Sequence, residues 1–143
     1  MNVQSILRRK GRTVVTIGPG TKVAEAAALL RHHGIGALVV SRDGRAVEGI
    51  LSERDIVHAL ADQGASILQF EVGRLMSRHV ITCHPEDRIA DLMALMTERR
   101  IRHLPVLERG TLAGIVSIGD VVKNRLDEVE SEATSMRELI AGA

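Results

Sequence analysis

Hydrophobic and polar positions along the chain predict the same opening elements in two places. Apolar β-type runs at 14–17 (VVTI) and 80–83 (VITC) end in Gly-Pro-Gly and His-Pro-Glu turns. An apolar stripe at helical spacing then follows, formed by Val23, Ala27 and Leu30 in one place and by Ile89, Met93 and Met96 in the other. Each part of the chain therefore begins with a short strand and an amphipathic helix.

Two further strands and a second helix complete each part. The runs GALVV (36–40) and HLPVL (103–107) are apolar enough for buried strands, and turns lead from them into VEGIL (47–51) and LAGIV (112–116). Inward-facing apolar residues follow at Ile56, Val57 and Leu60, and at Val121, Val122 and Leu126. The predicted order is β-α-β-β-α, twice, in an α/β (α+β) fold.

The two parts also agree residue by residue. Segments 14–40 and 80–106 align at a constant offset of 66, with identical residues at nine positions. After the turns the offset becomes 65, and GILSERD (49–55) matches GIVSIGD (114–120). The lead-ins Val-x-x-Ile-Leu and Val-x-x-Leu-Met, which start at Val3 and Val72, are similar as well. The chain is therefore an internal duplication.

The duplication suggests how the chain is organised. A half of roughly 60 residues is marginal for folding alone, so we expect the two halves to pack sheet to sheet about a pseudo-twofold axis. Residues 1–62 are the first repeat with a short lead-in helix, 63–71 are a linker with its break at Gly64, and 72–126 are the second repeat. Residues 127–143 form a helical tail.

Two readings of the tail stay open. Apolar residues at a 3-4-3-4 spacing favour one amphipathic helix; they are Leu126, Val129, Ala133, Met136 and Ile140. Alternatively, Ser135-x-x-Glu138 is a capping box that starts a separate short helix.

Composition narrows the class of protein. The 143 residues carry 19 Lys and Arg against 18 Asp and Glu, so no global charge recruits nucleic acid or an anionic membrane. Phe70 is the one aromatic residue, which leaves no platform for stacking bases. The single Cys83 suits a reducing compartment, and the first residues contain no apolar run typical of a signal peptide. We expect a cytoplasmic protein.

The repeated Gly-apolar-apolar-Ser-x-x-Asp motif lies where a predicted strand meets a helix. One reading is structural, because Ser caps a helix start and Ser-x-x-Asp resembles a capping box. The other reading is a ligand site. A helix start and a Ser hydroxyl suit a phosphate, while an ionised Asp accepts hydrogen bonds from both hydroxyls of a ribose. The capping reading explains the Ser better than it explains an Asp in both copies.

Together, the duplication, the segment ERRIRHLPV (98–106) and the paired GILSERD and GIVSIGD resemble the CBS domain, which occurs in tandem as a Bateman module. The resemblance covers residues 1–126 and is similar to small bacterial stand-alone CBS pairs. It implies a regulatory module that senses AMP, ADP or ATP, or NAD(H), without catalysis and without a required cofactor. It also implies a disc-shaped homodimer.

The resemblance further implies two ligand sites, each built from both repeats. One combines Thr13, Ile35, Gly36, Ala37, Ile115, Ser117 and Asp120. The other combines Ile50, Ser52, Arg54, Asp55, His79, Ile101, Arg102 and His103.

These two sites should not be equivalent. Gly36 and Ala37 leave an open, apolar floor in the first site, whereas Arg102 and His103 crowd the second with positive charge, unless they form a solvated strand edge. Arginine suits phosphate through its bidentate fork. We therefore expect ligand binding to depend more on Asp120 than on its counterpart Asp55.

Other functions have less support. A constitutive dimeric interaction module, in which the motifs are only caps, is the main alternative, and an unidentified protein target fits either function. A homodimer is expected because Val57, Leu60, Val122, Leu126 and the tail carry more apolar surface than one chain hides. His79, Cys83 and His84 lack the spacing of a metal site, and no Ser-His-Asp or Cys-His spacing indicates catalysis.

Overall fold

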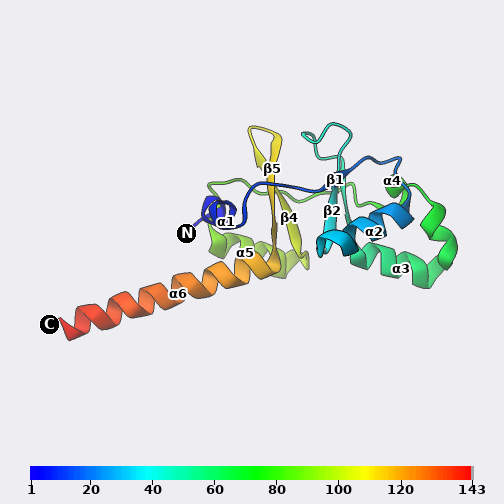
Figure 1. Ribbon diagram of the computed structural model, residues 1–143. Coiled ribbons are helices and arrows are strands. Elements are labelled where there is room, and N and C mark those ends of the chain that lie inside the picture. The colour runs from blue at the N-terminus through cyan, green and yellow to red at the C-terminus, as the bar shows by residue number, and fades with distance from the viewer. Residues whose placement is uncertain (143) are drawn as a thin grey trace.

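The computed structural model describes residues 1–142, and its first repeat contains a three-stranded sheet and two helices (Figure 1). The elements are β1 (Thr16–Ile17), α2 (Val23–His33), β2 (Ala37–Val40), β3 (Gly49–Ser52) and α3 (Glu53–Gln63). Strand β1 pairs parallel to β2, and β2 pairs antiparallel to β3. All four residues of β2 are buried, as expected for the central strand. The predicted order of elements is confirmed here.

The second repeat departs from the prediction at one strand. It contains α5 (Ile89–Arg99), β4 (His103–Glu108), β5 (Thr111–Ser117) and α6 (Ile118–Ala141), with β4 antiparallel to β5. The run VITC is not a strand, because only Cys83 forms a bridge, parallel to Val106. Extending that ladder by one step would need a backbone N–H at position 105, and Pro105 has none.

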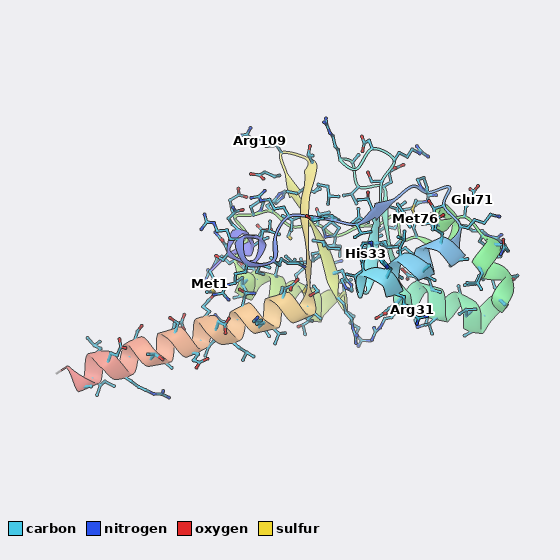
Figure 2. All side chains as sticks on the ribbon, in the orientation of Figure 1. Met1, Arg31, His33, Glu71, Met76 and Arg109 are labelled. Atoms are coloured by element: carbon cyan, nitrogen blue, oxygen red, sulfur yellow. The ribbon has the colours of Figure 1, made fainter. Side chains whose placement is uncertain are left out.

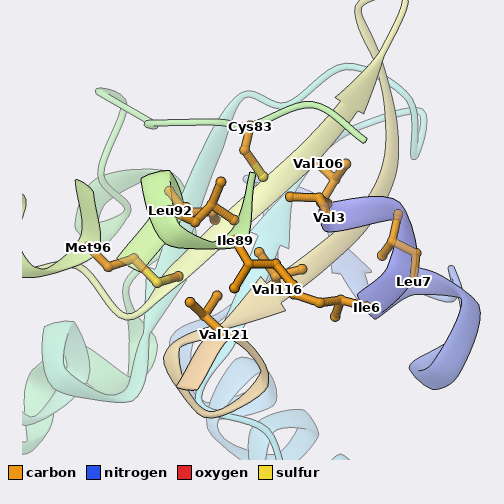
Figure 3. Packing of buried hydrophobic residues seen from close by; sticks show 11 residues of the cluster. Val3, Ile6, Leu7, Cys83, Ile89, Leu92, Met96, Val106, Val116 and Val121 are labelled. Carbon is orange, nitrogen blue, oxygen red and sulfur yellow. The ribbon is translucent and has the colours of Figure 1, made fainter. Parts of the chain in front are cut away.

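The two lead-in helices are exchanged between the repeats. Helix α1 (Val3–Lys10) packs on the second repeat, and α4 (Val72–Leu75) packs on the first. Val3, Ile6 and Leu7 of α1 are almost fully buried in the core of the second repeat, beside Ile89 and Val116 (Figure 3). Each such side chain contributes about 1.5–3 kcal/mol by leaving water, so the exchange ties the repeats together.

Two glycines allow these exchanged segments to approach the sheets. A Cβ at Gly114 on β5 would lie 2.6 Å from Leu7 Cδ2, and a Cβ at Gly49 on β3 would lie 2.6 Å from Met76 Sδ. A side chain at either position would require its neighbour to move. The repeated glycine of the motif therefore lies where the lead-in of the other repeat crosses the strand.

Both sheets stand side by side, with helices α2 and α3 beside one and α5 and α6 beside the other (Figure 1). The halves touch directly where Gly36 meets the ring of His103, whose Cε1 would lie 3.1 Å from a Cβ at position 36. Between the repeats, Gly64 ends α3 with a φ of 76°, and Ala65–Gln69 forms a 3-10 helix.

Helix α6 continues from the second repeat into the tail as one element of 24 residues. Of the two readings of the tail, the single amphipathic helix is therefore confirmed, and Ser135 starts no separate helix. The apolar side chains of the tail are exposed, as are Val57 and Leu60 on α3. Within residues 1–142, no helix combines the length and apolar character needed to cross a membrane.

Candidate functional site

Both copies of the motif form a complete capping box at a helix start. Ser52 Oγ accepts from Asp55 N at 3.2 Å, and Asp55 Oδ2 accepts from Ser52 N at 2.8 Å. Ser117 and Asp120 repeat the arrangement at 3.1 and 2.9 Å. The capping reading is thus confirmed for both copies, since each bond joins groups three residues apart.

Each helix start is also bonded to the segment that precedes a strand of the same repeat. Glu53 N donates to Gly36 O at 2.9 Å, and Ile118 N donates to Arg102 O at 2.8 Å. These bonds hold the capped helix starts next to residues 36 and 102, which the sequence placed in the ligand sites. The capped helix starts therefore lie beside residues of the predicted ligand sites, so the capping reading does not exclude the ligand reading.

A cavity of about 310 Å³ opens at the start of α3, and we call it cleft A. Its wall includes every residue predicted for the second site: Ile50, Ser52, Arg54, Asp55, His79, Ile101, Arg102 and His103. Gly36, Ala37, Glu53, His58 and Arg100 are among the other lining residues. The structure therefore gathers residues from both repeats into one space.

The polar groups of cleft A are available to a ligand. None of the ion pairs found within residues 1–142 involves Asp55, Arg54 or Arg102. Asp55 uses Oδ2 for the cap, and it lines the cavity together with arginine and histidine residues. Ile50, Ala37 and Ile101 supply apolar surface in the same cavity. This combination suits a ligand with an apolar ring, a diol and a negatively charged group.

A second cavity of about 280 Å³ shares Gly36, Ala37 and His103 with cleft A, and we call it cleft B. Its lining includes six of the seven residues predicted for the first site: Thr13, Ile35, Gly36, Ala37, Ile115 and Ser117. Asp120 is not part of the wall. Lys10, which the sequence reading did not place in a site, lines the cavity instead.

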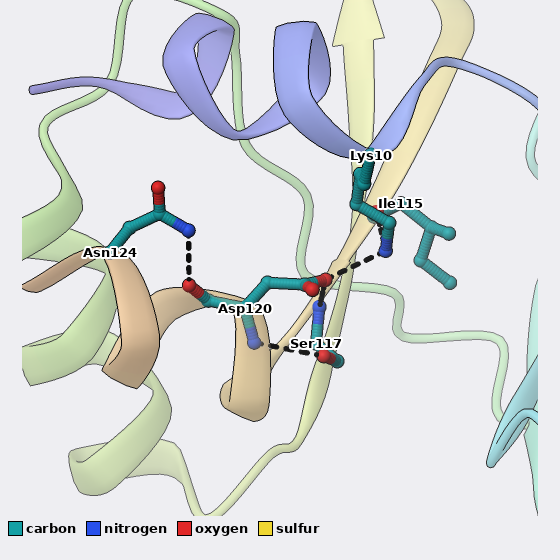
Figure 4. A network of polar contacts seen from close by, with 5 residues as sticks. All are labelled: Lys10, Ile115, Ser117, Asp120 and Asn124. Atoms are coloured by element: carbon teal, nitrogen blue, oxygen red, sulfur yellow. Dashed lines mark hydrogen bonds and ion pairs between the residues drawn. The ribbon is translucent and has the colours of Figure 1, made fainter. Parts of the chain in front are cut away.

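Lys10 contacts Asp120 and a backbone carbonyl of β5 at cleft B (Figure 4). Its Nζ donates to Asp120 Oδ2 at 2.7 Å and to Ile115 O at 3.0 Å. Burial raises the pKa of Asp120, but the hydrogen bonds from Lys10 and Ser117 outweigh it, so the pKa lies below its usual value. Asp120 is therefore an ionised and paired carboxylate.

This pairing is a difference between the two predicted sites that the sequence did not anticipate. The sequence predicted the more open floor and the more important Asp at Asp120, but Gly36 and Ala37 line both cavities. Asp55, in contrast, takes part in none of the ion pairs found within residues 1–142. A signal for Lys10 was present, because aligning the lead-ins at Val3 and Val72 places Lys10 opposite His79, a predicted site residue.

His103 is shared by the two clefts. Its side chain lines both cavities and contacts Gly36. Burial lowers the pKa of His103, and the charges of Lys10 and Arg102 lower it further against the opposite effect of Glu53 and Asp120. The imidazole is therefore neutral near pH 7 and can both donate and accept one hydrogen bond.

Two other histidines and the cysteine lie away from both clefts. His32 and His33 are exposed at the end of α2, and Cys83 is buried with its Sγ 3.8 Å from Pro105 O. Within residues 1–142, no group of three or more His, Cys, Asp or Glu side chains is placed to hold a metal ion.

Comparisons with known proteins agree with this architecture. The CBS domain profile matches residues 3–62 and 72–127. The CBS domain-containing protein CBSX3, mitochondrial, of Arabidopsis thaliana is 38% identical over 124 residues; the match covers 84% of this chain and 60% of that protein. The crystal structure of the CBS-domain containing protein ATU1752 from Agrobacterium tumefaciens is 51% identical, with a TM-score of 0.84. That match covers 87% of this chain and 99% of the other.

Two similar structures contain ligands. The CBS domain protein PAE2072 from Pyrobaculum aerophilum, complexed with AMP, has a TM-score of 0.74 and 26% identity over 84% of this chain and 89% of that one. The CBS domain pair of protein MJ0100, in complex with 5-methylthioadenosine and S-adenosyl-L-methionine, has a TM-score of 0.78 and 25% identity over 90% and 98%. With both repeats matched, the chain belongs to the CBS domain family and carries the domain twice.

Proposed function

We propose that the protein is a regulatory ligand-binding module that takes up an adenine nucleotide in cleft A and performs no catalysis. One observation carries the proposal: Asp55, Arg54 and Arg102 line a single cavity between the repeats and none of them is engaged in an ion pair within residues 1–142. Each group matches one part of a nucleotide.

Different residues of cleft A suit the ribose, the phosphate and the adenine ring of a nucleotide. The Asp55 carboxylate accepts hydrogen bonds from a ribose diol, because an ionised carboxylate is an acceptor only. Arg54 and Arg102 bind phosphate, assisted by the positive end of α3. Ile50, Ala37 and Ile101 offer apolar contact to the faces of an adenine ring. AMP, ADP, ATP and NAD(H) all carry these three parts.

The ligands in similar structures support adenosine as the common element. AMP, 5-methylthioadenosine and S-adenosyl-L-methionine all contain it. Three arginines in cleft A favour a phosphate over the cationic sulfonium of S-adenosyl-L-methionine. We therefore place phosphorylated adenosines first among the candidate ligands.

Cleft B is the weaker candidate for a second ligand. A ribose that binds Asp120 must displace the Lys10 ammonium or share the carboxylate with it, and a displaced ammonium loses a partner at 2.7 Å. Ligand in cleft B is thus opposed by an interaction that cleft A lacks.

Regulation follows if the two repeats change their arrangement. Cleft A takes residues from both repeats, so a ligand there favours whichever relative position of the halves gives the better contacts. A ligand shifts such an equilibrium only by its difference in affinity for the two arrangements.

Calorimetric titration with AMP, ATP, NADH and S-adenosyl-L-methionine, using Asp55→Asn and Asp120→Asn as a matched pair, tests the proposal. Asn still accepts the hydrogen bond of the cap, so both variants should fold. Loss of the charged acceptor in cleft A should cost about 1.5–3 kcal/mol of binding, or roughly tenfold to hundredfold in affinity. The Asp120→Asn protein should bind within about twofold of the parent, since a change far below 1.4 kcal/mol is expected there.

Three results would count against the proposal. No heat with any of these compounds at millimolar concentration would remove the nucleotide. Full affinity in the Asp55→Asn protein would show that the motif is only a cap. Equal losses in both variants would place the ligand elsewhere.

A further inference from the structure

The second half of α6 lies apart from the rest of the molecule. The helix projects from the second repeat as a single rod, and no other segment accompanies its C-terminal part (Figures 1 and 2). Five large apolar side chains along α6 are 45% to 71% exposed: Leu126, Val129, Met136, Leu139 and Ile140. An isolated helix gains its stability mainly from packing of an apolar face, and this face has no partner within residues 1–142.

The exposed face keeps the spacing of a coiled coil. Val122, Leu126, Val129, Ala133, Met136 and Ile140 follow one another at intervals of four, three, four, three and four residues. In heptad positions a to g, residues 126, 133 and 140 are at a, and residues 122, 129 and 136 are at d. A repeat of seven with apolar a and d positions forms a left-handed seam between two helices.

We propose that this seam binds α6 of a second copy of the chain as a parallel, in-register, two-stranded coiled coil. The charged residues beside the seam favour a second copy of α6 in the parallel orientation. In a parallel pair, each g position faces the following e position of the other helix. Arg125 then faces Glu130 of the partner subunit, and Glu132 faces Arg137 of the partner subunit. By symmetry each contact occurs twice, so four opposite-charge pairs flank the seam.

An antiparallel pair gives the opposite result. With the same seam, position 126 meets 136 and position 129 meets 133, so the apolar contacts are retained. The e positions then face each other, as do the g positions. Glu130 would lie beside Glu130 of the partner subunit, and Glu132 beside Glu132 of the partner subunit. Lys123 would also meet Arg137 of the partner subunit. Like charges therefore disfavour this orientation.

The body of each protomer leaves the seam accessible. Val121 and Asn124 are buried against the second repeat, Arg9 pairs with Asp127 at 2.9 Å, and the N-terminal ammonium lies 3.4 Å from Glu128. These contacts all lie on the side of α6 opposite to the seam, so they leave the seam uncovered. Arg125 pairs with Glu128 at 2.6 Å within its own helix, and it exchanges or shares this partner on assembly.

Cross-linking tests the orientation. Met136→Cys places thiols at a d position, where the two copies of residue 136 meet only in a parallel, in-register pair. Ser135→Cys is the matched control on the outer side of the helix, and the buried Cys83 is present in both proteins. Rapid oxidation of the Met136→Cys protein alone to a disulfide dimer is the expected result. Equal or slower cross-linking than the control would overturn the proposal.

Charge reversal tests the pairing independently, by sedimentation at tens of micromolar protein. Glu132→Arg and Arg137→Glu each replace two attractive contacts by two repulsive ones, and should weaken the dimer by about tenfold. The double variant restores attraction and should recover the parent's affinity. A monomeric parent, or a dimer that none of these changes affects, would overturn the proposal. Stronger association of the Arg137→Glu protein alone would indicate the antiparallel pair, where position 137 meets Lys123 of the partner subunit, and would overturn the proposal as well.

Discussion

Replacing Gly49 by Ala tests whether the exchanged lead-in determines how closely the chain approaches β3. A Cβ at this position would lie 2.6 Å from Met76 Sδ, 2.9 Å from Met76 Cγ and 2.9 Å from Ser77 O. The methionine end can move, but the carbonyl is fixed. Ser77 O accepts from Ile50 N at 3.0 Å, and Ser77 N donates to Ile50 O at 2.9 Å. Relief of the clash therefore requires separating a paired backbone.

The size of the effect comes from two opposing contributions. Without a clash, Gly→Ala stabilises a protein by about 0.4–1 kcal/mol, because the unfolded chain loses freedom. Overpacking a well-filled core costs about 1–3 kcal/mol. We expect Gly49→Ala to lower the free energy of unfolding by about 1–2 kcal/mol. Gly114→Ala should cost less, about 1 kcal/mol or below, because its Cβ meets only the side chain of Leu7.

Urea unfolding followed by circular dichroism measures both values, with Gly119→Ala as the control. At Gly119, in the first turn of α6, the nearest atom to a Cβ is Ser117 Oγ at 3.6 Å, an ordinary contact. This variant should gain up to about 1 kcal/mol from helix propensity. A Gly49→Ala protein as stable as the parent, beside a stabilised Gly119→Ala protein, would refute the close approach of the lead-in.

Two further predictions concern titratable groups. The pKa of His103 is lowered chiefly by burial, so below about pH 6.5 the unfolded chain binds more protons than the folded protein. Stability should therefore fall as the pH drops through this range. His103→Gln should remove the part of this pH dependence that His103 causes. If thermal melts show the same dependence of stability on pH in both proteins, the lowered pKa of His103 is contradicted. Burial raises the pKa of Cys83 to about 12, so its thiol should react with a labelling reagent at pH 8 only as fast as the protein opens. Rapid labelling of the native protein would show that Cys83 is accessible.

Local interactions explain what was predictable from the sequence. The capping boxes at Ser52 and Ser117 join groups three residues apart, so the pattern Ser-x-x-Asp is enough to identify them. Apolar periodicity likewise predicts the helices and the two antiparallel strand pairs. It fails at 80–83, where a strand needs a partner with a backbone N–H and Pro105 is opposite. The residues of cleft A could be named because the resemblance to the CBS domain implies which positions of each repeat line a ligand site.

The tertiary structure decided which repeat each lead-in joins. Val3 and Val72 have the same local pattern, so the pattern alone does not say which repeat each lead-in packs on; in the structure Leu7 lies against Gly114 and Met76 against Gly49. That choice brings Lys10 to Asp120, 110 positions away along the chain. A contact of this kind has no periodicity and no fixed spacing.

The sequence by itself therefore determined the duplication, the caps and the apolar seam of α6, whereas the predicted lining of cleft A came from the family resemblance. The tertiary structure decided that Asp55 is unpaired while Asp120 is held by Lys10, which makes two similar motifs unequal. The physical reason is the range of the interactions. Caps and helix faces are satisfied within a few residues, whereas an ion pair forms only where folding brings two distant charges together.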